Sequence, residues 1–256
     1  MNSMTLYVDR DSLVHKQLAP LTKALYVLVS IAVSYIIPSL TVALILTSIS
    51  ALILILGKVF RNILPVLALS ILLVASVIIV QGFFHPENQT ELFRIGAVVF
   101  YKEGLYYASL IAVRIINMIM AFGILIFTTA HDELVESMIK KGLSAKIGYV
   151  LLSVLQLIPQ MSATMDKITD AQRSRGMETE GNLIVRMKAF FPLIGPVVLN
   201  SLSNTRERAI ALEIRGFDSG IQKNFLNLAK EYHYQVAIQI LLWLTLVLAI
   251  VWRVLA

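Results

Sequence analysis

The sequence has no cysteine and little charge: Asp, Glu, Lys and Arg make up 15% of its 256 residues. Without cysteine, the chain has no disulfides, no thiol chemistry and no thiolate ligands for a metal. Soluble domains contain about 25% charged residues, clearly more than this chain. In addition, 57% of this chain is hydrophobic and its mean hydropathy is +0.78. This balance predicts a protein that resides in a lipid bilayer.

Charged residues are absent from three long stretches, 24–57, 62–86 and 232–251. A helix needs about 20 apolar residues to cross the hydrocarbon core, which is roughly 30 Å thick. The first two spans share one uncharged stretch, and Pro38-Ser39 predicts a tight turn between them. We therefore predict membrane-spanning helices at about 24–37, 40–56, 62–81, 105–128 and 233–252.

Lysines and arginines near the span ends predict the orientation, because such residues concentrate in cytoplasmic loops. Lys16 and Lys23 precede the first span, and Lys58 and Arg61 lie between the second and the third. We therefore expect a multi-pass protein of the cell membrane, with its N-terminus in the cytoplasm and the 82–104 loop outside.

The composition changes abruptly at segment 131–231, which holds 13 of the 22 basic and 11 of the 16 acidic residues. Its two apolar pieces, 147–159 and 189–202, are shorter than a span and contain prolines. We interpret them as helices that dip into or pack beneath the membrane bundle; the alternative is that they are two further crossings. The topology favours the first interpretation, because a crossing at 189–202 would separate two related motifs described below.

These patterns predict an all-α fold, a polytopic membrane protein with about five transmembrane helices. Residues 1–130 are expected to form a bundle of about four spans, residues 131–231 a cytoplasmic helical domain, and residues 232–256 the last transmembrane helix.

Two related segments occur 40 residues apart, Ala171-Gln-Arg-Ser-Arg-Gly176 and Ala211-Leu-Glu-Ile-Arg-Gly216. Both are predicted to end helices, because glycine adopts the left-handed conformation that closes a helix and a cation suits the negative end of the helix dipole. A single copy is explained as an ordinary helix stop. Two copies on one side of a membrane favour a second role, in which Arg175 and Arg215 bind acidic groups on a soluble, paired partner.

Several stretches together resemble one family. The first is the lead-in Ser12-Leu-Val-His15-Lys-Gln-Leu-Ala-Pro20-Leu-Thr22-Lys23, and the second is the pair Thr128-Thr129 before an amphipathic 131–141 segment. The others are the step Leu157-Ile-Pro159 and the tripeptides Ser174-Arg175-Gly176 and Ile214-Arg215-Gly216. Together they are similar to motifs of the transmembrane T component (EcfT-like, related to CbiQ) of energy-coupling-factor importers. In that family, two cytoplasmic coupling helices each end in an Ala-Arg-Gly-type motif. Ser174 and Ile214 depart from the usual alanine.

The resemblance implies a function. Two ABC-type ATPase subunits, identical or different, would bind the coupling helices, and closure of the ATPase dimer would reorient a membrane-embedded, substrate-binding S component that carries a vitamin or a transition-metal ion. Arg175 and Arg215 would bind acidic residues of the ATPases, and Gly176 and Gly216 would let the backbones approach. The chain itself would be a non-catalytic subunit without a cofactor.

Other kinds of site find little support. The string from Gly176 to Leu183 has the glycine spacing of a phosphate-binding loop but lacks its lysine and its Ser/Thr. The four histidines lie on separate segments, which gives no pattern of metal ligands. The net charge of +6 is dispersed and has no platform of aromatic residues for nucleic acid.

Two questions stay open, namely the function of the chain and the role of Arg114. The chain is either the coupler described above or a stand-alone permease with a regulatory 131–231 segment. Arg114, inside the fourth predicted span, either faces the bundle interior in a functional role, or extends outward or pairs with an outer-loop acid such as Glu103.

Overall fold

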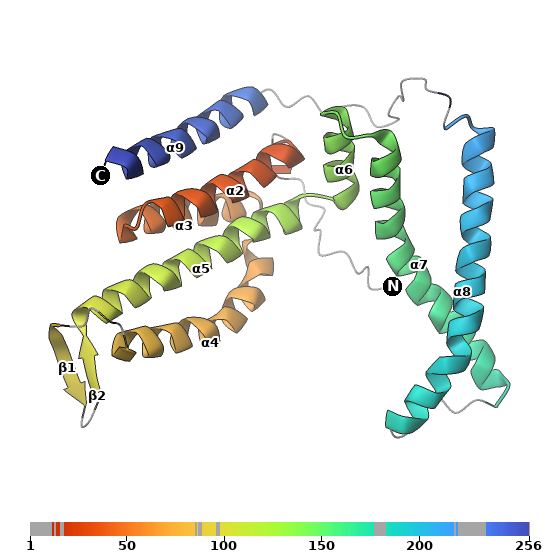
Figure 1. Ribbon diagram of the computed structural model, residues 1–256, viewed down its shortest axis with the longest axis horizontal. Coiled ribbons are helices and arrows are strands. Elements are labelled where there is room, and N and C mark those ends of the chain that lie inside the picture. The colour runs from red at the N-terminus through yellow and green to blue at the C-terminus, as the bar shows by residue number, and fades with distance from the viewer. Residues whose placement is uncertain are drawn as a thin grey trace. The chain divides into compact units, whose positions relative to one another are not determined.

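The computed structural model describes residues 12, 14, 15, 18–84, 86, 89–95, 98–176, 183–217, 219 and 234–255. These residues form helices and one β-hairpin (Figure 1). The elements are α2 (Pro20–Ile36), α3 (Leu40–Leu56), α4 (Phe60–Phe84), β1 (Glu91–Ile95), β2 (Val98–Tyr101), α5 (Lys102–Thr128), α6 (His131–Lys140), α7 (Ala145–Ser174), α8 (Leu183–Ile214) and α9 (Gln235–Leu255).

The predicted all-α, polytopic membrane fold is confirmed. Each predicted span corresponds to a helix, namely α2, α3, α4, α5 and α9. Among the described residues, α4, α5, α7 and α9 are long and apolar enough to cross a bilayer, while α2 and α3 are shorter apolar helices. The chain divides into two compact units: residues 1–141 with 229–256, and residues 142–228.

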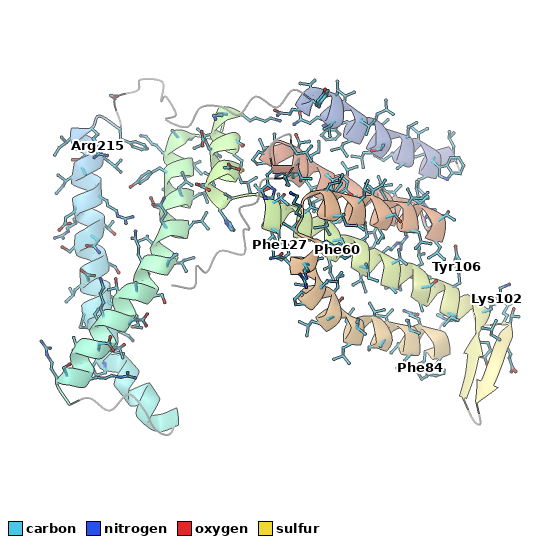
Figure 2. The ribbon with its side chains drawn as sticks, turned by 180° about the vertical axis from the view of Figure 1, so that it is seen from behind. Phe60, Phe84, Lys102, Tyr106, Phe127 and Arg215 are labelled. Atoms are coloured by element: carbon cyan, nitrogen blue, oxygen red, sulfur yellow. The ribbon has the colours of Figure 1, made fainter. Side chains whose placement is uncertain are left out.

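Helix α5 is the centre of the first unit, where it packs against α2, α3 and α4. Small residues lie on its buried face, among them Ala108, Ala112, Ala121 and Gly123. Small side chains let helix backbones approach closely, which is the main source of packing energy where lipid removes the hydrophobic drive between helices. Phe60 and Phe127 lie at one end of α4 and α5, and Phe84 and Lys102 at the other, so these helices run antiparallel (Figure 2).

Two apolar cores hold the bundle together. One joins α3, α4 and α5 through Leu54, Val59, Ile63, Met120, Ile124 and Phe127. The other joins α2 to α9 through Val29, Val33, Leu242 and Ala249.

Helix α4 presents nearly its whole surface outward, because only Ile63 and Gly82 of its 25 residues are buried. Such a surface would favour aggregation in water but suits contact with lipid. The helix bends near its start (Figure 1), where Pro65 lacks the N–H that the helix ladder requires.

The connection between α4 and α5 contains structure that the sequence did not predict. Strands β1 and β2 pair antiparallel, with Ile95 opposite Val98 and Glu91 opposite Tyr101. The first turn of α5 holds the base of this hairpin, because Glu103 accepts hydrogen bonds from the Thr90 backbone N–H at 3.1 Å and from Thr90 Oγ1 at 2.5 Å.

The second unit is a pair of long helices, α7 and α8, in contact with each other. The predicted apolar pieces 147–159 and 189–202 are not short helices: α7 continues through Pro159 for 30 residues, and α8 through Pro192 and Pro196 for 32. A proline inside a helix bends it but does not end it when neighbouring structure holds both halves. Both helices are visibly bent in Figure 1.

Candidate functional site

The first arginine-glycine segment ends α7 as predicted. The helix stops at Ser174, and Gly176 takes a φ of +87°, in the left-handed region that favours glycine. The Gly176 N–H donates to the carbonyl of Arg173 at 2.9 Å, and Ser174 Oγ donates to the carbonyl of Asp170 at 3.1 Å. The turn is therefore closed by local bonds, which leaves the Arg175 side chain outside the closure.

The second segment ends α8 with the same geometry. Gly216 has a φ of +67°, and its N–H donates to the carbonyl of Glu213 at 2.9 Å. The N–H of Phe217 reaches back to the carbonyl of Leu212 at 3.0 Å. These two bonds make up a Schellman closure, in which the glycine conformation brings the chain back over the last helical turn. The prediction that both segments are helix ends is confirmed.

Both arginines of these ends are presented to the surroundings. Arg175 and Arg215 are exposed, and within the described residues neither has an ion pair or side-chain hydrogen bond. Ile214 is 80% exposed, so a bulky apolar group lies beside the second cation. Ser174 is exposed beside the first. The two ends thus offer the same charge with a different neighbour.

The packing of α7 on α8 separates the two ends. Arg208 Nη2 donates to Gln160 Oε1 at 2.6 Å, and the rings of Tyr149 and Phe217 lie 5.3 Å apart. These contacts fix an antiparallel register in which Arg215 lies level with about residue 152 of α7. From there to Arg175, α7 runs for roughly another 35 Å at 1.5 Å per residue. The tripeptides are therefore not one cluster but opposite ends of one helix pair, and Figure 2 shows Arg215 at its end of α8.

A second group of motif residues meets at one end of the bundle. Lys23, only 3% exposed, donates from Nζ to the carbonyl of Thr128 at 2.8 Å. Its neighbour Thr22, 1% exposed, accepts a hydrogen bond at Oγ1 from Gln239 Nε2 at 2.9 Å. The lead-in and the Thr128-Thr129 pair, quoted separately from the sequence, are thus in direct contact. Sequence reasoning missed this contact, although both partners belonged to motifs that it had singled out.

The lead-in also closes on itself before α2. Ser12, which is buried, shares a hydrogen bond of 2.7 Å between its Oγ and His15 Nδ1. His15 is therefore part of a local turn. Among the described residues, no group of His, Asp and Glu is arranged to hold a metal ion. His85, His233 and the 177–182 part of the glycine string lie outside the described residues.

A buried polar network joins three helices of the bundle. Asn117 donates from Nδ2 to Ser30 Oγ at 3.0 Å and accepts at Oδ1 from Ser50 Oγ at 3.0 Å. Tyr26 extends the network through a 2.7 Å hydrogen bond between its hydroxyl and Ser50 Oγ. The sequence carried a signal for it, since Tyr26 and Ser30 lie four residues apart on one face of an uncharged, mainly apolar stretch.

Arg114 lies against an aromatic ring. Its guanidinium carbon is 5.0 Å from the centroid of the Tyr35 ring, within the range of a cation–π interaction. Glu103, the outer-loop acid named above as a possible partner, accepts hydrogen bonds from Thr90. Nε and Nη2 of Arg114 are buried and have no hydrogen-bond partner among the described residues, so the cation lies between α5 and the Tyr35 ring of α2 and does not extend outward.

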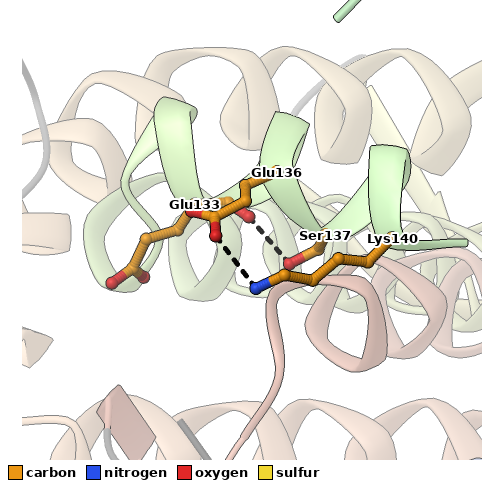
Figure 3. Close-up of polar contacts among 4 residues, drawn as sticks. All are labelled: Glu133, Glu136, Ser137 and Lys140. Carbon is orange, nitrogen blue, oxygen red and sulfur yellow. Dashed lines mark hydrogen bonds and ion pairs between the residues drawn. The ribbon is translucent and has the colours of Figure 1, made fainter. Parts of the chain in front are cut away.

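Helix α6 follows the Thr128-Thr129 pair and belongs to the first unit. Its first turn carries Asp132, an anion at the positive end of the helix dipole, and its last turn carries Lys140, a cation at the negative end. Both placements are favourable. Lys140 forms an ion pair of 2.9 Å with Glu136, and Ser137 Oγ donates to the carbonyl of Glu133 at 2.7 Å (Figure 3). These contacts stabilise α6 along a half-buried side, while Val135 is buried.

Comparisons with known proteins bear on the whole chain. A family model described as "CbiQ: Cobalt transport protein" matches residues 11–225. The energy-coupling factor transporter transmembrane protein EcfT of Clostridium kluyveri is 29% identical over 228 residues, which covers 84% of this chain and 83% of the relative. EcfT of Streptococcus equi is 26% identical over 228 residues, covering 84% and 82%. EcfT of Leuconostoc gelidum is 31% identical over 160 residues, covering 59% of each chain.

These matches extend over both the bundle and the pair of helices that carries the two arginine-glycine ends. They confirm the predicted family. The chain therefore belongs to the CbiQ/EcfT family and is a transmembrane component of the energy-coupling factor transporter type.

Proposed function

We propose that this protein couples ATP hydrolysis on two ABC-type ATPase subunits to a membrane-embedded S component, which carries a vitamin or a transition-metal ion. The observation that carries the proposal is the pair of exposed arginines, Arg175 and Arg215, each at a closed helix end. The relatives' name, energy-coupling factor transporter transmembrane protein, supports an assembly of several subunits.

The separation of the two ends supports a paired partner. About 35 Å along the helix axis is too far for one acidic groove on a single small domain to bind both cations. Two ATPase subunits, each with a groove of the same kind, fit two ends of the same kind. In this arrangement Arg175 binds one subunit and Arg215 the other.

The arrangement also determines how α7 and α8 lie. Both cations have to reach the same aqueous side, although they occupy opposite ends of the helix pair. The pair therefore lies along the membrane face, even though α7 is long enough to cross. The second half of α7 suits an aqueous face, because Asp166, Lys167, Asp170 and Arg173 follow its apolar first half.

The chemistry of the contact follows from the two side chains and the two glycines. A guanidinium binds a carboxylate through two parallel hydrogen bonds in a fixed plane, which gives geometric specificity as well as attraction. Among the described residues, no atom lies within 4 Å of a Cβ placed on Gly176, which suits close approach of a partner to the backbone there. We propose that ATP hydrolysis belongs to the partners and cargo recognition to the S component.

Charge reversal tests the proposal. The chain is co-expressed with the ATPases encoded in its own genome and purified in mild detergent. Arg175→Glu together with Arg215→Glu is expected to abolish co-purification of the ATPases, because each attraction becomes a repulsion. The matched control is Lys167→Glu with Arg206→Glu, which reverses one exposed cation on each of the same helices away from the ends.

The control pair is expected to retain both ATPases, which shows that the effect is not one of net charge. Retention of both ATPases by the Arg175→Glu, Arg215→Glu variant would contradict the docking role. Transport by the purified chain alone in liposomes would contradict the coupling function and favour the permease.

A further inference from the structure

The coupling unit, residues 142–228, joins the bundle by only two chain connections. The first leads from α5 through α6 to Gly142, and the second leads into α9. Any displacement of α7 and α8 that is passed through the chain has to pass through one of them. The residues that fix these two connections to the bundle therefore determine how much of the displacement the bundle receives.

Lys23 fixes the first connection. Its Nζ donates to the carbonyl of Thr128, the last residue of α5, at 2.8 Å. The last carbonyls of a helix lack partners within the helix and carry its negative dipole end, so a buried cation is well placed there. Thr129 and Ala130 follow in extended conformation, with φ values of −131° and −72°, so the chain turns directly from this contact into α6.

Thr22 fixes the second connection. Its Oγ1 accepts from Nε2 of Gln239, which lies in the second turn of α9. Thr22 is 1% and Lys23 is 3% exposed, so neither contact is readily replaced by water. A buried polar group that loses its partner costs the full desolvation penalty, which makes both contacts expensive to break.

We propose that the dipeptide Thr22-Lys23 is a positioning clamp through which movement of the coupling unit reaches the membrane bundle. Adjacent residues of one helix, α2, hold both chain connections at the same place. A displacement of α7 and α8 therefore moves α2, α5 and α9 together and is not absorbed by a loose junction. The inference rests on the coupling function proposed above.

The absence of cysteine from the chain allows a direct test with single cysteines as reporters. Ile210→Cys, at a position 57% exposed on α8, reports on the coupling unit, and Tyr106→Cys, at a position 52% exposed near the start of α5, reports on the far end of the bundle. Maleimide labelling of each is timed in the purified complex with its ATPases, without nucleotide and with ATP and vanadate.

In the otherwise unchanged chain, ATP and vanadate are expected to change the labelling rate at both reporters. With Lys23→Met and Thr22→Val, the change at position 210 is expected to persist while the change at position 106 is lost. Thr22→Ser keeps the hydroxyl and is expected to retain both. Ser50→Ala is the structural control, because it removes an equally buried polar contact away from both connections and is expected to leave both responses intact.

The outcomes separate the two proposals. A response at position 106 that survives Lys23→Met and Thr22→Val, in a complex that still responds at position 210, overturns the clamp alone. A chain that retains no ATPase in any variant overturns the coupling function and the clamp with it. If Lys23→Met does not assemble, Thr22→Val and Gln239→Leu test the α9 connection separately, and an unchanged response at position 106 overturns the clamp.

Discussion

Asn117 offers the sharpest test of how the bundle is held together. It is 1% exposed, and its amide bonds to Ser30 on α2 and Ser50 on α3, each at 3.0 Å. Asn117→Leu keeps a side chain of similar size and removes the amide. Ser50 keeps its bond to the Tyr26 hydroxyl at 2.7 Å, whereas Ser30 loses its bonds to Asn117.

The expected loss is modest, because interhelical hydrogen bonds in membrane proteins contribute about 0.6 kcal/mol on average and about 1.7 at most. Two such bonds give a destabilisation of about 1 to 3 kcal/mol. Part of it comes from the buried Ser30 hydroxyl, which loses its bonds to Asn117, since a buried group that loses its partner costs more than a bond contributes. Asn117→Leu combined with Ser30→Ala is therefore expected to be more stable than Asn117→Leu alone, with Ser50 kept because it still bonds to Tyr26.

The assay is reversible unfolding in mixed micelles with increasing SDS, followed by circular dichroism. Ser48→Ala is the control, because this exposed hydroxyl bonds only to the carbonyl of Leu44 in its own helix and its removal is expected to change stability very little. If Asn117→Leu with Ser30→Ala is less stable than Asn117→Leu alone, the cost lies in packing, and the reasoning from the Ser30 hydroxyl is refuted.

Two glycines give further predictions. Gly123→Ala places a Cβ onto Ile63 Cδ1 and is expected to cost about 1 to 3 kcal/mol of unfolding free energy through overpacking. Adding Ile63→Val should recover part of this loss. An unaltered SDS midpoint for Gly123→Ala would contradict this packing. Gly216→Ala puts a Cβ at a φ of +67° and is expected to cost about 1 to 2 kcal/mol, seen as faster amide exchange in the last turn of α8. Gly195→Ala is the control, because it lies inside α8 with no atom within 4 Å of the new Cβ and should not speed exchange.

The membrane helices were predictable because their length is set from outside the protein. A bilayer requires about 20 apolar residues, and the predicted spans 40–56 and 105–128 end where α3 (Leu40–Leu56) and α5 (Lys102–Thr128) end. The β-hairpin after α4 was missed because its strands have only five and four residues and a count of apolar runs does not detect them. The internal prolines led to the opposite error, because they predicted a short helical piece where α8 continues through Pro192 and Pro196.

The helix ends were predictable for a local reason, and the contacts of the bundle were not. A cation followed by glycine closes a helix by bonds within five residues, as Gly216 and Phe217 do. The bonds of Lys23 to Thr128 and of Gln239 to Thr22 join residues 105 and 217 positions apart, and no local pattern specifies such a pairing. The placement of the two arginines at opposite ends depends likewise on how α7 packs against α8.

The distribution of polar groups differs between the two units in a way that suits coupling. In the second unit, Arg175 and Arg215 are exposed and available to a partner. In the bundle, Lys23 and Asn117 are buried and hydrogen-bonded between helices. Where lipid surrounds the helices, apolar contact alone does not fix their register, because a lipid tail offers the same contact. Directional hydrogen bonds do fix it, and a body that passes on a displacement has to keep its internal register while it moves.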